Sequence, residues 1–173
     1  MSDPRNQPQY QVRFGFGLQQ ASRLTPGADV LVWADALADG LTPAPDLAGE
    51  FSILTAGTGA ASSVADWVIA QQERKGDRVT VTVVAAGDAD GGFTVDDLLA
   101  AGAIIDALAD AGIDYISPEA ASAVAAYTSL RPAHNHLLSA STAGQQLAKS
   151  VGRAGLNEAI RSNGAASFEI VRE

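Results

Sequence analysis

The segment Arg78 to Ala86, with the sequence RVTVTVVAA, constrains the fold more than any other part of the chain. Its nearly continuous run of β-branched residues is typical of a strand that is buried on both faces of a sheet. Asp29 to Asp35 is a second short apolar run and ends in an acid, and Phe51 to Thr55 is a third. Strands of this kind need helices on both sides, because neither face can be left to water. These runs therefore predict a largely parallel sheet.

Helical patterns separate the predicted strands. Val64 to Lys75 has apolar residues at helical spacing and stops at Gly76, and Val95 to Leu108 carries a longer apolar stripe. Ser117 and Pro118 are a suitable N-cap and first residue for another helix. Strands that alternate with helices at this spacing predict an α/β fold, with a mostly parallel or mixed sheet and helices on both faces.

A single domain is the simplest organisation for this sequence. Its 173 residues lie within the usual range for one domain with its own core. We expect a flexible tail over residues 1–9, which are polar and include two prolines, and one domain over residues 10–173. Tyr10 to Phe16 supplies the first strand of that domain, and Ser167 to Val171 supplies a last strand at the edge of the sheet.

The charge and composition exclude several classes of function. The net charge is −9 and the eleven basic residues are scattered, which argues against a nucleic-acid partner. The absence of cysteine excludes disulfides and thiolate metal sites. No apolar run approaches the roughly 20 residues of a membrane helix, and residues 1–9 do not resemble a signal peptide. We therefore expect a cytoplasmic protein without a membrane partner, and a homo-oligomer is compatible with the sequence.

The best candidate site is a group of carboxylates that follow the predicted strands. In an open α/β sheet, ligands bind beyond the carboxyl ends of the strands. Asp35 ends the second strand, and the segment Gly87 to Asp97 follows the RVTVTVVAA strand. That segment contains four acids, namely Asp88, Asp90, Asp96 and Asp97. Carboxylates at one strand end can hold Mg²⁺, which prefers a few carboxylates together with water and a phosphate.

Local structure offers another explanation for part of this pattern. Asp96 and Asp97 fall in the first turn of a helix whose N-cap is Thr94. Acids in that position stabilise the helix dipole by about 0.3–1 kcal/mol each without any function. Asp35 is less easily explained in this way, because it ends a buried strand.

Two further segments have a possible binding role. The small residues Thr55 to Ala60, which include Gly57, Thr58 and Gly59, can cradle an anion with backbone N–H groups at the start of the next helix. This segment lacks the lysine of a phosphate loop. The pair His134 and His136 has the spacing of a metal chelate, although two surface histidines are the simpler interpretation.

Several stretches together resemble the 2-phosphosulfolactate phosphatase family of Mg²⁺-dependent phosphatases. The most specific is Val84 to Asp88 followed by Phe93 to Ile104, which is similar to the family's core pattern "VAAG…FSxEDLLAAGAI". Asp29 to Leu37 resembles the family strand "DVVVVVDVL", and Ala60 to Ala65 resembles its helix start "NASAVA". The resemblance covers most of the chain from Val12 onward.

The resemblance implies a small phosphorylated substrate and Mg²⁺ as cofactor. Asp35 corresponds to the acid that closes the family's strand pattern, and Asp96 and Asp97 correspond to its Glu-Asp pair. We therefore expect Asp35 and Asp97 as catalytic groups and all three acids as metal ligands. The residues expected around the substrate are Arg13, Thr55, Gly57, Thr58, Gly59 and Gly87.

The chain also departs from the family pattern. After Asp35 the family carries an Arg- or Ser/Thr-rich segment, whereas this chain has Ala38-Asp39-Gly40, and a longer family insertion is missing before Ile53. A phosphatase must stabilise spread negative charge with cations or convergent donors, and only Arg13 remains as a basic residue in a matched stretch. Two hypotheses therefore stay open: a Mg²⁺-dependent phosphatase, and a shortened, inactive homologue that acts as a binding or assembly module.

Overall fold

The computed structural model describes residues 3–38 and 42–173 and shows one five-stranded mixed sheet with helices on both faces, which confirms the predicted α/β fold. The strands are β1 (Val12–Phe16), β2 (Val30–Ala34), β3 (Ser52–Ala56), β4 (Val81–Ala85) and β5 (Glu169–Arg172). The helices are α1 (Gly17–Leu24), α2 (Ala61–Lys75), α3 (Val95–Asp110), α4 (Pro118–Leu130), α5 (His134–Ala140) and α6 (Thr142–Asn163). Short 3-10 turns are η1 (Pro4–Asn6), η2 (Thr58–Ala60) and η3 (Arg131–Ala133).

The strand order is β1-β4-β2-β3-β5, and among these described strands only β5 runs antiparallel to its neighbour. The four parallel strands end at one level, because Ala85 of β4 is paired with both Phe16 of β1 and Ala34 of β2. Ala34 is in turn paired with Ala56, the last residue of β3. The loops that follow these strands therefore start from one side of the sheet, which we call the carboxyl edge.

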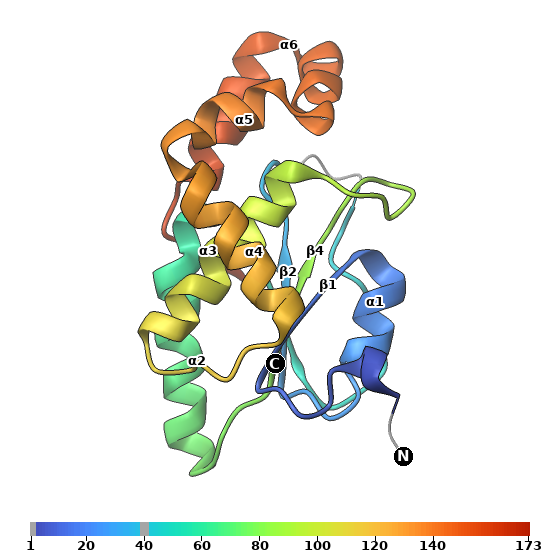
Figure 1. Ribbon diagram of the computed structural model, residues 1–173. Helices are drawn as coiled ribbons and strands as arrows, with labels where there is room; N and C mark the ends of the chain where they lie inside the picture. The colour runs from blue at the N-terminus through green and yellow to red at the C-terminus, as the bar shows by residue number, and fades with distance from the viewer. Residues whose placement is uncertain (1–2, 39–41) are drawn as a thin grey trace.

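The two faces of the sheet are covered differently. Helices α2, α3 and α4 cover one face and form the larger part of the core with it (Figure 1). The other face is covered by α1 and by the segment around Ala44 and Leu47. Trp33 lies in this second part of the core, and its Nε1–H donates a hydrogen bond to the carbonyl of Thr42 at 2.9 Å. The sequence predicts that the apolar strands are buried on both faces of the sheet, and the structure confirms this burial.

Helices α5 and α6 lie across the carboxyl edge (Figure 1). They pack through Leu138, Leu147 and Leu156 onto Leu37, which follows β2. Gly152 interrupts α6 with a φ of 75°, so that the two halves of this helix run in different directions. The resulting cap covers part of the place where ligands of α/β proteins bind. None of the described helices is long and apolar enough to cross a membrane.

The outer edge of β1 is closed by the chain itself. The side chain of Gln7 is buried, donates to the carbonyl of Phe14 at 2.8 Å and accepts the Phe14 N–H at 2.9 Å. The carbonyl of Val12 accepts the N–H of Ser117 at 2.9 Å. Part of the segment expected to be a loose tail is therefore packed against β1. Since these backbone groups are paired, β1 offers little for a strand from another molecule.

Candidate functional site

Asp97 joins two of the loops at the carboxyl edge. Its side chain is 3% exposed. Oδ1 accepts the N–H of Ala36 at 2.8 Å, and Oδ2 accepts the N–H of Gly87 at 2.9 Å. Gly87 has a φ of 76°, a conformation that favours glycine. One buried carboxyl group therefore holds the loop after β2 against the loop after β4.

Thr94 completes this arrangement at the start of α3. It is the N-cap residue, as the sequence predicts, but its side chain caps no backbone N–H. Its hydroxyl lies 2.8 Å from Oδ2 of Asp97 instead. The alternative explanation of Asp97, as an acid that only stabilises the helix dipole, is therefore too narrow, because its side chain also accepts hydrogen bonds from two loops.

The carboxyl groups of Asp35 and Asp96 come close enough to that of Asp97 to change its pKa. Burial, then the charge of Asp96 and then that of Asp35 raise the pKa of Asp97 to about 8. Hydrogen bonds from Ala36 and Thr94 favour the charged form and oppose this shift, but burial outweighs them. Asp97 is thus mainly protonated at pH 7 in the absence of a metal ion.

Asp35 is the acid of this group that reaches an open surface. It is partly exposed, and its Oδ1 accepts the N–H of Ala38 at 2.7 Å. Together with Thr55 and Gly57 it lines a cleft of about 280 Å³, which we call the β2–β3 cleft. Ser162, Asn163 and Glu169 belong to the same lining.

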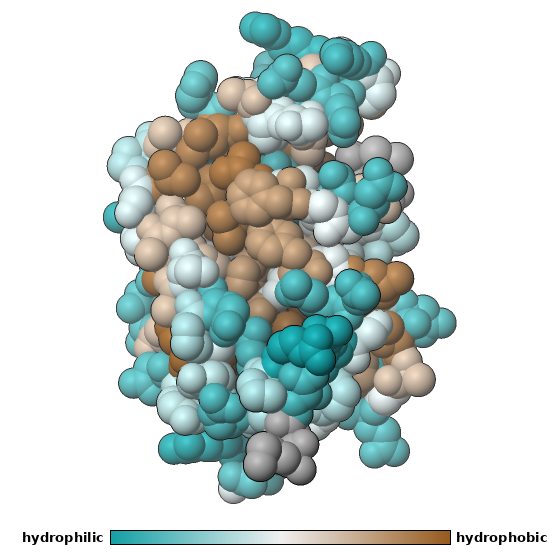
Figure 2. Space-filling model, turned by 45° about the vertical axis from the view of Figure 1, so that its right-hand side comes forward, coloured by the Kyte–Doolittle hydropathy of each residue, from teal (hydrophilic) through white to brown (hydrophobic). Residues whose placement is uncertain are grey.

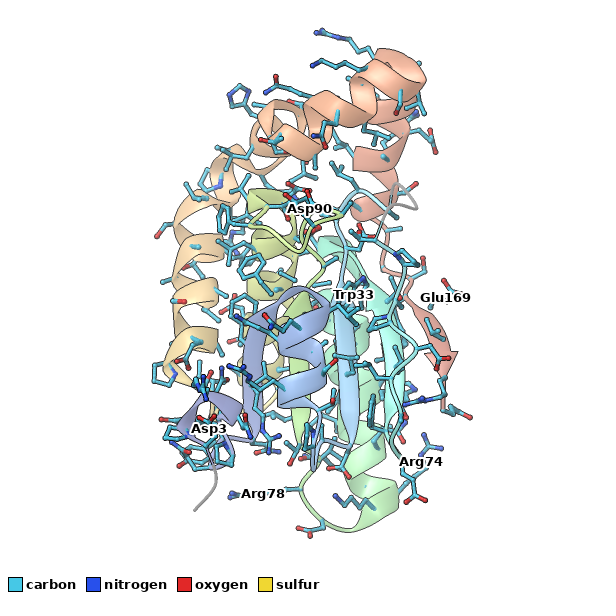
Figure 3. The ribbon with its side chains drawn as sticks, turned by 90° about the vertical axis from the view of Figure 1, so that its right-hand side faces the viewer. Asp3, Trp33, Arg74, Arg78, Asp90 and Glu169 are labelled. Carbon is cyan, nitrogen blue, oxygen red and sulfur yellow. The ribbon has the colours of Figure 1, made fainter. Side chains whose placement is uncertain are left out.

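Gly87 lies on a second hollow, of about 240 Å³, which we call the β4 cleft. The exposed residues Asp88, Asp90 and Phe93 line it, together with Thr142 at the start of α6. Asp90 lies at the carboxyl edge below the α5–α6 cap, and Glu169 lies on the outer strand (Figure 3). Asp35, Thr55 and Gly57 therefore line one cleft and Gly87 lines the other, with Asp97 buried between their loops.

The structure gives the glycines after β3 a different environment from the expected anion cradle. The N–H of Thr58 donates to Oδ1 of Asn163 at 2.8 Å. A Cβ atom on Gly57 would lie 2.6 Å from that same oxygen, and one on Gly59 would overlap the carbonyl of Gly164. These glycines let the end of α6 approach the η2 backbone. The amide oxygen of Asn163 takes a donor that an anion would need.

Sequence reasoning missed Asn163, the last residue of α6. Its side chain is 5% exposed, and its Nδ2 lies 3.1 Å from Nε2 of His134. Burial lowers the pKa of His134, so this imidazole is neutral at pH 7. His134 is half-buried, whereas the simpler interpretation of the sequence placed it on the surface. The partners of Asn163 are distant in sequence, so no local sequence pattern predicts these contacts.

Replacing Asn163 with alanine should loosen α6 from η2. The change removes the acceptor of the Thr58 N–H and the amide contact to His134, so we expect a loss of about 1–3 kcal/mol in the free energy of unfolding. Faster hydrogen exchange at the Thr58 amide should accompany it. Asn157, exposed on the same helix, provides the control. Equal exchange rates in the Asn163→Ala and Asn157→Ala variants would contradict this role.

Arg13 does not join the predicted site. It is the second residue of β1, on the amino side of that strand, and it is 6% exposed. Its Nη1 donates to the carbonyls of Leu24 and Pro26 at 2.8 and 3.0 Å, at the end of α1. The residue expected near the substrate thus has structural partners at the opposite end of the sheet.

The oxygen donors at the carboxyl edge suit Mg²⁺ in their chemistry. Within residues 3–38 and 42–173, no three His, Cys, Asp or Glu side chains form a group that could hold a metal ion. Mg²⁺ commonly uses only one or two carboxylates, together with water and substrate phosphate. Asp35 fits this use because it lines a cleft, whereas both oxygens of Asp97 have protein donors. Burial is the main cause of the raised pKa of Asp97, and a cation would relieve the repulsion from Asp96 and Asp35 that adds to it.

Comparison with known families supports the resemblance noted in the sequence. The model of the family described as 2-phosphosulpholactate phosphatase matches residues 45–167, which is most of the chain. The matched range contains the glycines after β3, Gly87, Asp96 and Asp97, and it does not extend to Arg13 or Asp35. No curated protein matched the chain. The extent of the family match shows that this chain belongs to the 2-phosphosulpholactate phosphatase family.

Proposed function

We propose that this chain is a Mg²⁺-dependent phosphoric monoester hydrolase that acts on a small phosphorylated substrate in the β2–β3 cleft. The observation that carries the proposal is the position of Asp35. It follows a buried central strand, its charge contributes to the raised pKa of Asp97, and it lines a cleft at the carboxyl edge. Family membership supports the class of reaction.

The residues have distinct roles in this proposal. Asp35 would hold Mg²⁺ together with water and the substrate phosphate, and the ion would neutralise charge on the phosphoryl group. Asp97 is a positioning residue, because it binds the N–H of Ala36 directly after Asp35. Thr55 and Gly57 form the wall of the cleft next to the substrate.

A specific observation favours a second candidate, a binding or assembly module without catalysis. The described residues that line the two clefts include no lysine or arginine. Phosphoryl transfer depends on cations or convergent donors around the developing charge. The Thr58 N–H, one such donor, is already bound by Asn163.

Phosphate release separates the two candidates. We would measure it from 2-phosphosulfolactate and from an aryl phosphate, with Mg²⁺ and with EDTA. The enzyme should show Mg²⁺-dependent release that falls about tenfold or more in the Asp35→Asn variant, since loss of even an outer-shell partner of a metal costs about 10–100-fold. The control is Asp66→Asn, an exposed acid on α2.

Each other outcome has a defined meaning. Release that persists in EDTA would reject the dependence on Mg²⁺. An equal loss of activity in the Asp35 and Asp66 variants would reject the assigned site. No release from either substrate would favour the module.

A further inference from the structure

An uncovered apolar surface runs over the end of β1, the start of α3 and the end of α4. We call it the Phe93 patch. Phe93 is 66% exposed and Leu130 is 38% exposed, and the half-buried side chains beside them pack onto the core below. Figure 2 shows apolar side chains gathered on this face of the molecule. The patch consists of Phe16, Phe93, Leu98, Tyr127 and Leu130.

Contacts between elements make this surface continuous. The rings of Phe16 and Phe93 lie 5.4 Å apart, which joins β1 to the segment before α3. Helices α3 and α4 approach closely at Gly102, where a Cβ atom would lie 2.7 Å from Cβ of Tyr127. Leu98 lies one turn before Gly102 and therefore on the same side of α3. Monomeric proteins seldom leave a continuous apolar surface of this kind to water.

The charges at the ends of the Phe93 patch are complementary. The exposed acids Asp88 and Asp90 lie in the loop directly before Phe93. The exposed cation Arg131 directly follows Leu130 at the other end. A two-fold axis through the patch would place each acidic loop opposite the Arg131 end of the other copy. In a chain of net charge −9, this arrangement lets two acidic molecules approach each other.

We propose that the Phe93 patch is the interface of a two-fold homodimer of this chain. An isologous interface uses the same surface on both copies, which the charge pattern of the patch permits. Exposed aromatic side chains are typical of the centre of such interfaces. The association uses side-chain packing, since the backbone edge of β1 is closed by Gln7 and Ser117.

The dimer also changes the surroundings of the β4 cleft. The β4 cleft shares residues with the proposed interface. Phe93 belongs to the patch itself, and Asp88 and Asp90 form its acidic end; all three line the cleft. A second copy would cover the outer side of the cleft and bring Arg131 near a rim where the charged residues among the described lining are Asp88 and Asp90. The dimer does not depend on the proposed hydrolysis, which is placed in the β2–β3 cleft.

Sedimentation velocity over a wide range of concentrations tests the proposal. The full chain should sediment with twice its mass of 17.7 kDa. Phe93→Asp and Leu130→Asp should each raise the dissociation constant about tenfold or more, as expected for truncation or charge at the centre of an interface. Val151 is 54% exposed on α6, outside the patch, so Val151→Asp is the matched control and should remain dimeric.

Charge reversal identifies the orientation of the two copies. Asp90→Arg and Arg131→Asp should each weaken the dimer, and the double variant should recover part of the loss because the pair is restored in the opposite sense. Circular dichroism would establish that each variant is folded. A monomer at all concentrations would overturn the proposal. So would a dimer that both apolar variants leave intact, or one that Val151→Asp disrupts equally.

Discussion

Replacing Asp97 with alanine is expected to lower the free energy of unfolding by about 3 kcal/mol or more. The change leaves the N–H groups of Ala36 and Gly87 without their acceptor, and it removes the partner of the Thr94 hydroxyl. A buried polar group that loses its partner costs about 1–3 kcal/mol, and the groups here lie in buried surroundings. The loss is large beside the 5–15 kcal/mol, roughly, that stabilises an ordinary domain.

Urea unfolding of the wild type and three variants would measure this effect. Asp97→Asn keeps one carbonyl oxygen as an acceptor, so its loss should be smaller than that of Asp97→Ala. Asp66→Ala changes an exposed acid and should stay within about 0.5 kcal/mol of the wild type. If Asp97→Ala and Asp66→Ala unfolded at the same urea concentration, Asp97 would not be what holds the two loops together.

The sheet follows closely from the sequence, because its strands are short apolar runs with few alternatives. The five strands of the described sheet lie within or overlap most of the predicted runs, which are Tyr10 to Phe16, Asp29 to Asp35, Phe51 to Thr55, Arg78 to Ala86 and the edge strand Ser167 to Val171. Helices α1 and α5 were not among the predicted elements. In α1 the buried residues are Gly17, Ala21 and Leu24, and two of these are too small to make an apolar stripe visible.

The site was predictable only in part, because convergence depends on which strands are neighbours. Asp35 and Asp97 are 62 positions apart in sequence, and they meet because β4 lies beside β2 and leads into α3. The glycines after β3 illustrate a different difficulty. A loop that binds an anion and a loop that admits another backbone both need small residues, so the sequence alone does not distinguish the two.

Arg13 and Asn163 also show that the sequence alone does not reveal which polar side chains belong to the site. Arg13 was predicted there and lies elsewhere, whereas Asn163 was not predicted and lines a cleft. Arg13 was expected near the substrate because it is the basic residue of a matched stretch, but a strand residue can lie at either end of a sheet. Asn163 had no local signal, and its partner Thr58 lies 105 positions earlier in the chain. Secondary structure could be predicted from local patterns, whereas the use of each polar group depended on the assembled fold.

The stability of the protein should fall as the pH rises from 6.5 to 8 in the absence of metal. Asp97 has an ordinary pKa of 3.8, and in the folded chain burial and the neighbouring acids raise the pKa to about 8. Between these values the folded state binds one proton more than the unfolded state, so stability decreases with pH by up to about 1.4 kcal/mol per unit. Relative to Asp97→Asn, the wild type should lose about 1–2 kcal/mol over this window.

The pH range from 6.5 to 8 limits the contribution of His134, another titrating group that would change the stability. Burial lowers the pKa of His134 from its ordinary value of 6.5. Below pH 6.5 the unfolded state therefore binds more protons at this residue than the folded state does. In that range His134 makes the free energy of unfolding rise with pH, which is opposite to the effect of Asp97. His134 is present in both proteins, so its contribution cancels in the comparison. Parallel stability curves for the wild type and Asp97→Asn in EDTA would show that Asp97 is ionised throughout the window.

Adding Mg²⁺ to the same experiment links this titration to the proposed function. A cation held by Asp35 would lower the pKa of Asp97, since nearby positive charge favours the ionised carboxylate. The pH slope of the wild type should then become flatter in Mg²⁺ than in EDTA. The Asp35→Asn variant should show the same slope in both solutions, because it lacks the proposed ligand. A wild-type slope that Mg²⁺ leaves unchanged would argue against a cation beside these acids without requiring any substrate to be turned over.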